Sequence, residues 1–492
     1  MLIFNFKKKE IMKYIKYLIV AVIGFAYMSC DTEEFLNPYP DTVIVVDTFF
    51  QSDDDVLSGI IGVYDALQGL SENVETNITR ANRGVQFEHL LTEHRTDNTR
   101  NATLEGSKSD FHRYVVNANN VESEDYYQSM YEVIFRANNI LNFISVADEA
   151  NQAKYTAEVK FLRAYAYFKL VRLFGDVPLV TTVVGPEDSE ALFTRIPETQ
   201  IYDQIIEDLQ EAINVLDNSF KSRASKAAAQ GILAKVYLTQ PNRNYLGAQQ
   251  LCESIINSME FDLVTNYSDV FYSELNDEII FAIQYETGVA LESQGFSAEF
   301  TSTFRQGRDD GQNIVNENLI ADFDLIGGNR TAVSYVTFGD TNEVAKFLPD
   351  GTDLSVTPAY YGPSPQQAGN DYIALRYADV LLMHVEAILA GGTSTNATGA
   401  LTSFQKIRNR AGLTDLVTTV TKDDLLKERR VELAFENQRY FDLVRLGVLD
   451  AVLSAHSTEM GYVYDPRRAL YLPIPQRERN LSGGLLSQNP GY

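Results

Sequence analysis

The sequence predicts a mainly α fold, in which repeated pairs of helices lie beside an irregular, loop-rich lobe. Apolar residues recur every three or four positions in two blocks, 157–258 and 372–446, as they do in helices that bury one face. Residues 70–125 and 260–370 break this period: the first stretch is rich in Asn, Thr, Arg, Glu and Ser, and most of the second is punctuated by Gly, Asp, Asn and Pro, as long loops are. Within the second of these stretches, only 278–283 is typical of a short strand.

Residues 1–29 have the features of a lipoprotein signal peptide. A lysine-rich flank precedes an apolar run at 17–28, which is too short to cross a bilayer core of roughly 30 Å. The signal ends at Ser29-Cys30, so we expect cleavage before Cys30 and acylation of its thiol and new amine, which anchors a protein stably. Ordinary secretion with an incidental Cys30 is the alternative, and Met12 is a second candidate start.

The main domain is predicted at 48–492, after a proline-punctuated tether at 30–47. It opens with a helix from Thr48, and a last helix runs from a capping-box signature at Thr421 to about Leu446. Between them, helices are expected at 126–144, 157–175, 201–216, 225–240, 245–258, 372–389 and 397–412.

Two of these helices share a pattern: a small residue, a larger apolar residue four positions later, and another three positions after that. Ala248, Cys252 and Ile255 match Ala400, Phe404 and Ile407 in this way. A small first residue lets a partner helix approach closely, and the others fill the groove. The pattern resembles the tetratricopeptide repeat, whose helix pairs stack into a superhelical scaffold. Generic amphipathic helices are the alternative.

The composition excludes several classes of partner and cofactor. The formal net charge of −26 repels phosphate backbones, so no nucleic-acid partner is expected. His89 and His94 are five residues apart and share no helix face, and no metal-ligand or nucleotide motif is present, so neither a metal nor a cofactor is expected. Cys252 is expected to be a small buried apolar side chain.

Acids and arginines alternate near the end of the second block. Glu428, Glu432 and Glu436 follow each other at i, i+4, and glycoside hydrolysis uses a pair of carboxylates. The neighbouring arginines would hold these acids ionised, however, whereas a general acid needs a raised pKa. We therefore expect no catalytic residue, and we expect Arg376 and Asp379 to pair at i, i+3. The residues expected in structural ion pairs are Arg376, Asp379, Glu432, Glu436, Arg439 and Asp442.

Four segments together resemble the SusD/RagB family of binding lipoproteins, in order and in spacing over essentially the whole mature chain. They are Phe161-Leu162-Arg163-Ala164-Tyr165 continuing to Phe174-Gly175-Asp176-Val177-Pro178-Leu179; Arg376-Tyr377-Ala378-Asp379-Val380-Leu381-Leu382-Met383 with Glu386-Ala387; Arg429-Arg430-Val431-Glu432-Leu433 with Glu436, Arg439, Asp442, Leu443 and Arg445; and Leu472-Pro473-Ile474-Pro475 with Gln488-Asn489-Pro490-Gly491-Tyr492.

The resemblance implies a lipoprotein anchored through Cys30 in the outer membrane, facing the exterior, that forms the lid of a SusC-like TonB-dependent barrel transporter. It implies non-catalytic binding of a nutrient glycan, an oligo- or polysaccharide, and its delivery to that transporter. The alternatives are a RagB-like lipoprotein that binds peptide for uptake, a surface glycosidase, and a scaffold that only gates the transporter.

The irregular lobe is where we expect the ligand, because aromatic rings, amides, carboxylates and arginines for binding sugars occur there. Solvated loops are the alternative for each residue. The chain has no Trp, the usual stacking residue for glycans, which leaves room for a peptide ligand. The expected ligand-binding residues are Asn98, Arg100, Asn101, Phe304, Arg308, Asp309, Tyr360 and Tyr361.

Overall fold

The structure is a computed structural model that describes residues 49–69, 83–185, 189–300, 313–356, 359–365 and 367–492. The chain divides into two compact units, residues 1–55 and 56–492. In the first unit, the Ser52 hydroxyl donates to Asp55 Oδ2 at 2.7 Å, where helix α4 (Asp53–Gln68) begins. None of the helices described is both long and apolar enough to span a membrane.

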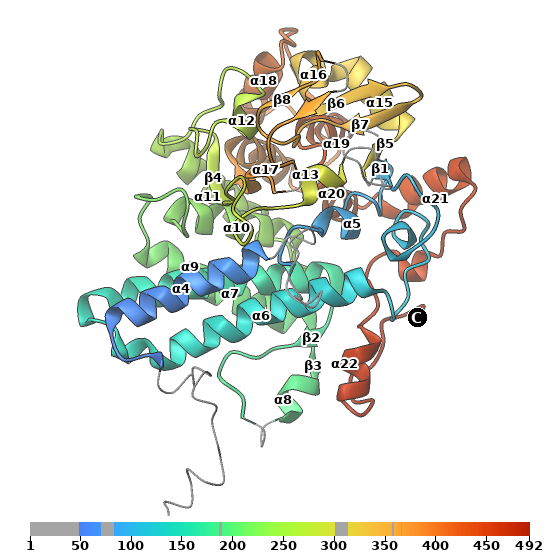
Figure 1. The fold of residues 1–492 in the computed structure, drawn as a ribbon. Helices are drawn as coiled ribbons and strands as arrows, with labels where there is room; N and C mark the ends of the chain where they lie inside the picture. Colours follow the sequence, from blue (N-terminus) through green and yellow to red (C-terminus); the bar gives the residue numbers. More distant parts are fainter. Residues whose placement is uncertain (1–48, 70–82, 186–188, 301–312, 357–358, 366) are drawn as a thin grey trace, which may run out of the picture. The chain divides into compact units, whose positions relative to one another are not determined.

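The second unit is mainly α-helical, as the sequence predicts (Figure 1). Helices α6 (Val121–Phe143) and α7 (Glu149–Phe174) pack on each other, and α7 packs on α9 (Glu198–Val215). The succession continues with α10 (Lys226–Thr239) against α9 and α11 (Tyr245–Ser258) against α10. Helices that follow each other in sequence are therefore neighbours in space, which is the arrangement expected of stacked helix pairs.

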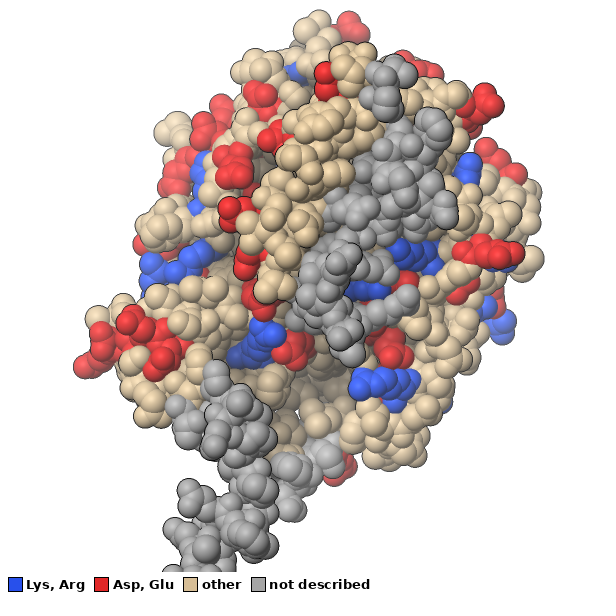
Figure 2. Space-filling view, viewed as in Figure 1, with Lys and Arg blue, Asp and Glu red and all other residues tan. Residues whose placement is uncertain are grey.

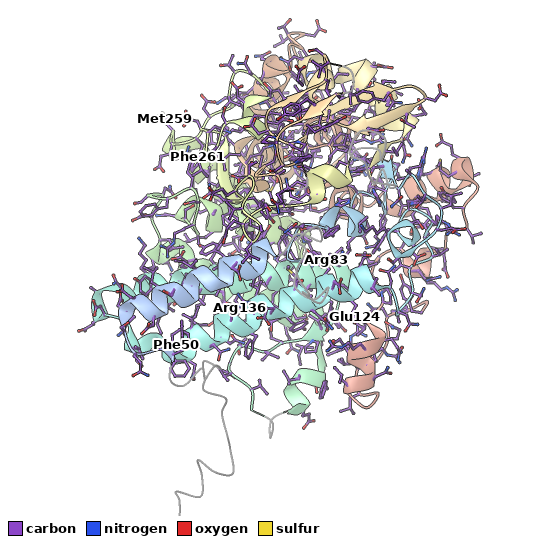
Figure 3. The ribbon with its side chains drawn as sticks, viewed as in Figure 1. Phe50, Arg83, Glu124, Arg136, Met259 and Phe261 are labelled. Atoms are coloured by element: carbon purple, nitrogen blue, oxygen red, sulfur yellow. The ribbon has the colours of Figure 1, made fainter. Side chains whose placement is uncertain are left out.

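The long helix α6 is tied to α4 by one arginine, Arg136 (Figure 3). Its Nη1 donates to Gly62 O at 2.5 Å and to Asp65 Oδ2 at 2.8 Å, and its Nε donates to Glu132 on its own helix at 2.8 Å. The side chains of Arg136 and of its two acidic partners are partly exposed, so these ion pairs add little to the free energy of unfolding. Their main effect is to fix the position of the two helices.

The two matching sequence patterns form buried helix faces. Helices α11 and α18 (Thr398–Arg410) both pack on α17 (Tyr377–Leu389). All six pattern residues are at most 3% exposed: Ala248, Cys252, Ile255, Ala400, Phe404 and Ile407. The expected burial of Cys252 is confirmed, and the mainly α fold with repeat-like helix pairs agrees with the prediction.

The helix predicted at 372–389 begins late. Tyr372–Arg376 forms strand β10, which pairs antiparallel with β4 (Ile279–Ile283), the strand expected at 278–283. Every residue of both strands is buried, so β-strand pairing satisfies backbone groups that would otherwise be left without partners inside the protein. The residues after Arg376 have the apolar spacing of a helix, so the sequence pattern did not show that a strand comes before the helix.

The stretches expected to be loops contain a small sheet. Its four antiparallel strands have the order β1-β5-β7-β6 and bounds Thr99–Arg100, Ile314–Val315, Thr341–Val344 and Tyr335–Phe338. Helix α15 (Glu317–Ile326) follows β5, and the one-turn helix α12 (Asp269–Tyr272) precedes β4. A second hairpin pairs β8 (Thr352–Asp353) with β9 (Tyr360–Tyr361). Strands of two to four residues leave little alternating pattern in the sequence.

The last predicted helix is interrupted. Helix α19 (Lys422–Glu432) starts with the expected capping box between Thr421 and Asp424, but it ends at Glu432. Phe435 and Asn437 then adopt left-handed backbone angles, with φ of 67° and 62°, before α20 (Arg439–Arg445) begins. The prediction of one continuous helix is wrong, and Glu436 therefore points from a turn instead of a helix face shared with Glu432.

The other described elements are α5 (Glu88–Leu91), η1 (Ser107–Asp110), η2 (Ile144–Val146), β2 (Val177–Pro178), α8 (Ser189–Phe193), β3 (Arg195–Ile196), α13 (Phe296–Glu299), η4 (Gly328–Arg330), α16 (Thr331–Ser334), β11 (Ser394–Thr395), β12 (Val420–Thr421), α21 (Leu449–Met460), η5 (Pro466–Arg468) and α22 (Gln476–Leu481).

Candidate functional site

Arg376, at the end of β10, is the centre of a buried group of charges that we name the Arg376 cluster. Its guanidinium donates to Glu278 Oε1 and Glu432 Oε1 at 2.6 Å each, and to the two oxygens of Glu436 at 2.7 Å each. The other members of the cluster are Arg330, Lys346, Arg408, Arg410 and Glu428. Burial alone would raise the pKa of Glu432, but the guanidinium groups around it hold that pKa well below its usual range.

Asp379 belongs to a second group, the Asp379 cluster. Its Oδ2 lies 2.6 Å from Lys235 Nζ, and its Oδ1 lies 2.9 Å from Arg429 Nη1. Asp442, Arg445 and Glu386 complete the cluster. The predicted pairing of Arg376 with Asp379 is wrong, because Arg376 ends a strand and Asp379 is on the next helix, so helical i, i+3 spacing does not apply across the junction.

The third group, the Asp97 cluster, joins the irregular lobe to the last helices. Arg439 Nε and Nη2 donate to the two oxygens of Asp97 at 2.9 Å each, and Arg430 Nη2 lies 2.9 Å from Asp97 Oδ2. Burial opposes ionisation of Asp97, yet the two arginines hold its pKa well below the usual range. Carboxyls held ionised in this way accept hydrogen bonds, but they cannot act as general acids.

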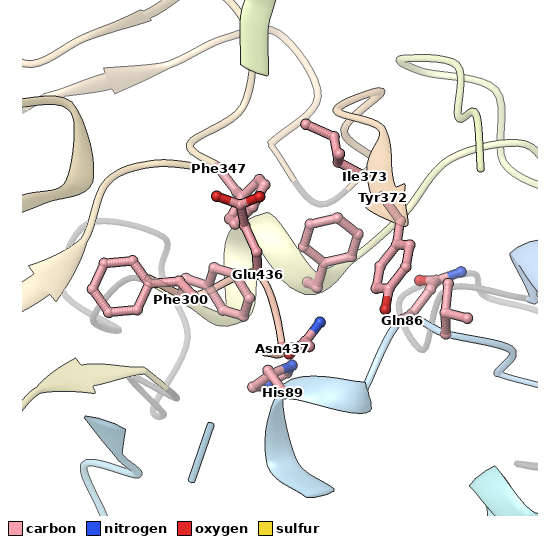
Figure 4. A pocket seen from close by; sticks show the side chains of 11 residues that line it. Gln86, His89, Phe300, Phe347, Tyr372, Ile373, Glu436 and Asn437 are labelled. Carbon is pink, nitrogen blue, oxygen red and sulfur yellow. The ribbon is translucent and has the colours of Figure 1, made fainter. Parts of the chain in front are cut away.

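A small pocket in the irregular lobe is lined mainly by aromatic rings. Figure 4 shows Phe300, Phe347 and Tyr372 at its border, with His89 and Asn437 beside them. Its volume of about 20 Å³ is close to that of a single water, so it has no room for a sugar ring. Burial, and secondarily Lys108, lower the pKa of His89 to about 3, so this imidazole is neutral and is part of the packing.

Two larger cavities meet at Tyr272 and Asp350, which line both of them. One, of about 320 Å³, lies between α12 and the β4–β10 pair, and the other, of about 450 Å³, lies towards the β8–β9 hairpin. The sequence predicted a ligand in this lobe but did not name either of these two residues. The available signal was an aromatic residue among acids, since Tyr272 lies between Asp269 and Glu274.

The first group of predicted ligand residues is mostly buried. Asn98 is fully buried, where it donates to Glu93 Oε2 at 2.9 Å and accepts from Arg430 Nε at 2.8 Å. Asn101 is 1% exposed and accepts from Thr103 N at 2.9 Å. Their proposed role as ligand contacts is therefore not supported, because both amides already hold the protein chain together. Arg100 is partly exposed and remains accessible.

The other predicted ligand residues are in different surroundings. Phe304, Arg308 and Asp309 lie outside the described residues. Tyr360 is 51% exposed, whereas Tyr361 is 4% exposed and packs on Ala345 and Leu348. Of the pair, only Tyr360 has an exposed side chain.

Among the residues that the structure describes, no group of three or more His, Cys, Asp or Glu side chains could hold a metal ion. Among the described carboxyls, Glu93 and Asp371 have pKa values raised as far as about 7. Burial raises the pKa of Glu93 to about 7, against the hydrogen bond from Asn98. Burial also raises the pKa of Asp371, which lines the cavity of about 320 Å³, to about 7.

Two family profiles match the chain. Residues 49–238 match the profile described as "Starch-binding associating with outer membrane", and residues 355–492 match the SusD family. The SusD-like protein P2 of Formosa agariphila is 27% identical over an alignment that covers 79% of this chain and 84% of that protein. The starch-binding protein SusD of Bacteroides thetaiotaomicron is 24% identical, with 70% of this chain and 74% of that protein covered.

The fold is also that of solved structures. Surface glycan-binding protein A of Bacteroides thetaiotaomicron, in complex with laminarihexaose, superposes with a TM-score of 0.72 at 21% identity, covering 89% of this chain and 99% of that chain. At this identity, the similarity establishes the fold.

Proposed function

The chain belongs to the SusD family, and from this premise we propose that it binds a nutrient glycan at the cell surface and delivers it, unchanged, to a SusC-like TonB-dependent transporter. Relatives described as binding starch or laminarihexaose support a glycan ligand. These relatives are described with different glucans. Family membership therefore supports a glycan as the class of ligand, and binding measurements are needed to identify the particular sugar.

The observation that carries the proposal is the pair of adjoining cavities at Tyr272 and Asp350. Their volumes are within the range of about 300–1,000 Å³ that is usual for small-molecule sites. Aromatic, amide and carboxylate side chains line them, and these are the groups that contact the faces and hydroxyls of sugars.

The three charge clusters support binding without chemistry. The acids of the sequence motif that could have been a catalytic pair, Glu428 and Glu432, are both bound to Arg330 at 2.6 and 2.8 Å. One observation favours hydrolysis instead: Asp371 lines a cavity and has a pKa of about 7, as a general acid would. Release of new reducing ends from a glycan, abolished by Asp371→Asn, would establish that second function.

For the location, we propose the outer membrane, with the protein attached through an acylated Cys30 and facing outwards. The family description that mentions association with the outer membrane supports this. Attachment at the start of a tether would leave the domain free to sit over a barrel transporter.

The test is a binding measurement on the full chain in mild detergent. Native gels containing laminarin, soluble starch or xyloglucan would detect a glycan ligand as retardation, and calorimetric titration with casein-type peptides would detect the RagB-like alternative. Retardation by one glycan, together with co-purification of a TonB-dependent barrel from the native membrane, supports the proposal. Heat from peptides and no retardation by any glycan would replace it with peptide uptake.

A further inference from the structure

We propose that the two cavities at Tyr272 and Asp350 form one groove, the Tyr272 groove, that takes an uncharged oligosaccharide and excludes glycans carrying carboxylate or sulfate groups. This inference rests on the proposed function, because it assumes a glycan ligand. It adds the place where the ligand lies and the property that selects it.

The ring that divides the groove is held in place. The Tyr272 hydroxyl donates to Ala345 O at 3.2 Å, while the residue is 38% exposed. The turn after it is fixed by Asn276, whose amide donates to Asp269 O at 3.0 Å and Ser273 O at 2.8 Å. A fixed, half-open aromatic ring loses little freedom when a sugar packs on it, which favours binding.

At one wall of the groove, the backbone at residue 369 passes close to the backbone of Thr287, and only a glycine fits there. A Cβ on Gly369 would lie only 2.7 Å from Thr287 N, closer than side chains pack. Next to it, Asn370 is 5% exposed, and its Nδ2 donates to Leu348 O at 3.0 Å. Its Oδ1 has no hydrogen-bond partner among the described residues. This enclosed amide oxygen keeps an unused acceptor beside the groove wall, which is the kind of group that an ordered water satisfies.

The negative charge of the side chains that line the groove is what favours neutral glycans over anionic ones. Among the described residues that line the groove, the ionisable acids are Glu274, Glu286, Asp350 and Asp371, and there is no Lys, Arg or His. Figure 2 shows acidic side chains over the upper left of the molecule, the side on which Figure 1 places α12. Carboxylates accept strong hydrogen bonds from sugar hydroxyls and repel an anionic glycan.

The far end of the groove lies beside the β8–β9 hairpin, which carries one residue that the sequence predicted, Tyr360. Thr352 and Leu354 line the cavity of about 450 Å³, and Thr352 and Asp353 pair with Tyr361 and Tyr360 in the β8–β9 hairpin. The exposed Tyr360 is therefore next to the rim, where it offers a second aromatic ring to a longer chain.

The experiment compares matched variants of the full chain by titration with the neutral glycan that retards the wild type most, and with the carboxymethylated form of that glycan. Tyr272→Ala removes the ring from the groove, and its control, Phe135→Ala, removes an aromatic residue that is 54% exposed on α6, outside the groove. Asp350→Lys reverses a charge at the groove, and Asp203→Lys does the same at an exposed position of α9. All four positions are exposed, so the variants are expected to fold.

We expect the wild type to prefer the neutral glycan, and Tyr272→Ala to weaken its binding by about tenfold or more, corresponding to the loss of roughly one strong contact. Asp350→Lys should strengthen binding of the carboxymethylated form, while both controls behave as wild type. Normal binding by Tyr272→Ala would place the sugar elsewhere and overturn the groove, but not the proposed function. Equal binding of both glycan forms would overturn the charge selectivity, and failure of the wild type to bind any glycan would overturn both proposals.

Discussion

Removal of Arg376 tests whether the buried charges hold this fold together. The Arg376→Met variant replaces the arginine by an apolar side chain of similar length, so it removes one positive charge and leaves most of the packing in place. Arg376 is 1% exposed and contacts three glutamates within 2.7 Å, so its loss removes from buried carboxylates the one cation that all three share, although Arg330, Arg410 and Lys346 remain beside them. Breaking a buried pair from one side costs about 3–5 kcal/mol, because the remaining charge stays desolvated.

The assay is urea-induced unfolding at pH 7, followed by two independent signals because a chain of this size need not unfold in one step. The matched control is Arg467→Met, since Arg467 pairs with Asp465 at the surface and is 74% exposed. We expect a large drop of the midpoint for Arg376→Met and none for the control. A loss below about 1 kcal/mol for Arg376→Met would refute the reasoning, because it would mean that water or a rearrangement compensates the glutamates.

Four further predictions follow from buried groups, the groove and the anchor. The clusters contain carboxyls whose folded pKa values lie below the unfolded ones, so their contribution is present above about pH 4.5 and is lost as pH falls; urea midpoints between pH 7 and 3 should decline. Folding shifts the pKa of Glu93 in the opposite direction, from 4.5 to about 7, so the folded protein loses stability as the pH rises from 4.5 to 7. Glu93→Gln should therefore be more stable than wild type to urea at pH 8, while its side-chain oxygen still accepts the hydrogen bond from Asn98. Gly369→Ala should cost about 1–3 kcal/mol, since its Cβ collides with Thr287, and a crystal structure would show the groove wall displaced. Cys30→Ala should abolish labelling by radioactive palmitate and release the protein from the membrane fraction, whereas unchanged labelling would contradict acylation at this residue.

The helical part of the fold could be predicted because its signal is local. The three-residue pattern of Ala248, Cys252 and Ile255 recurs at the right spacing, and a helix buries such residues on one face wherever it packs. The capping box at Thr421 was equally readable, because its two partners are three residues apart.

The charge clusters could be predicted in kind but not in detail. Arg376 binds Glu278 and Glu432, which are 98 and 56 residues away, and no spacing rule gives such partners. The turn at Phe435 was also hidden, since a phenylalanine rarely adopts a positive φ and its neighbours continue a helical pattern. The pairing assumed for Arg376 and Asp379 was wrong because Arg376 is the last residue of a strand and Asp379 lies in the helix that follows, so the spacing rule for a helix does not apply to them.

The ligand residues were the hardest to predict, because polar loop residues serve structure as well as binding. Asn98 looks like a sugar ligand in the sequence, yet the fold uses its amide to join Glu93 to Arg430. The local signal at Tyr272, an aromatic residue among acids, is weak, and only the fold brings this residue next to Asp350.

The central claim is that the protein binds a glycan without converting it. The most direct measurement is to incubate the full chain with the glycan that retards it in native gels and to follow bound ligand and new reducing ends in the same sample over time. The account predicts saturable binding and a constant number of reducing ends, with the intact glycan recovered after denaturation. An increase in reducing ends that is proportional to protein and time would contradict it and identify the protein as a glycosidase.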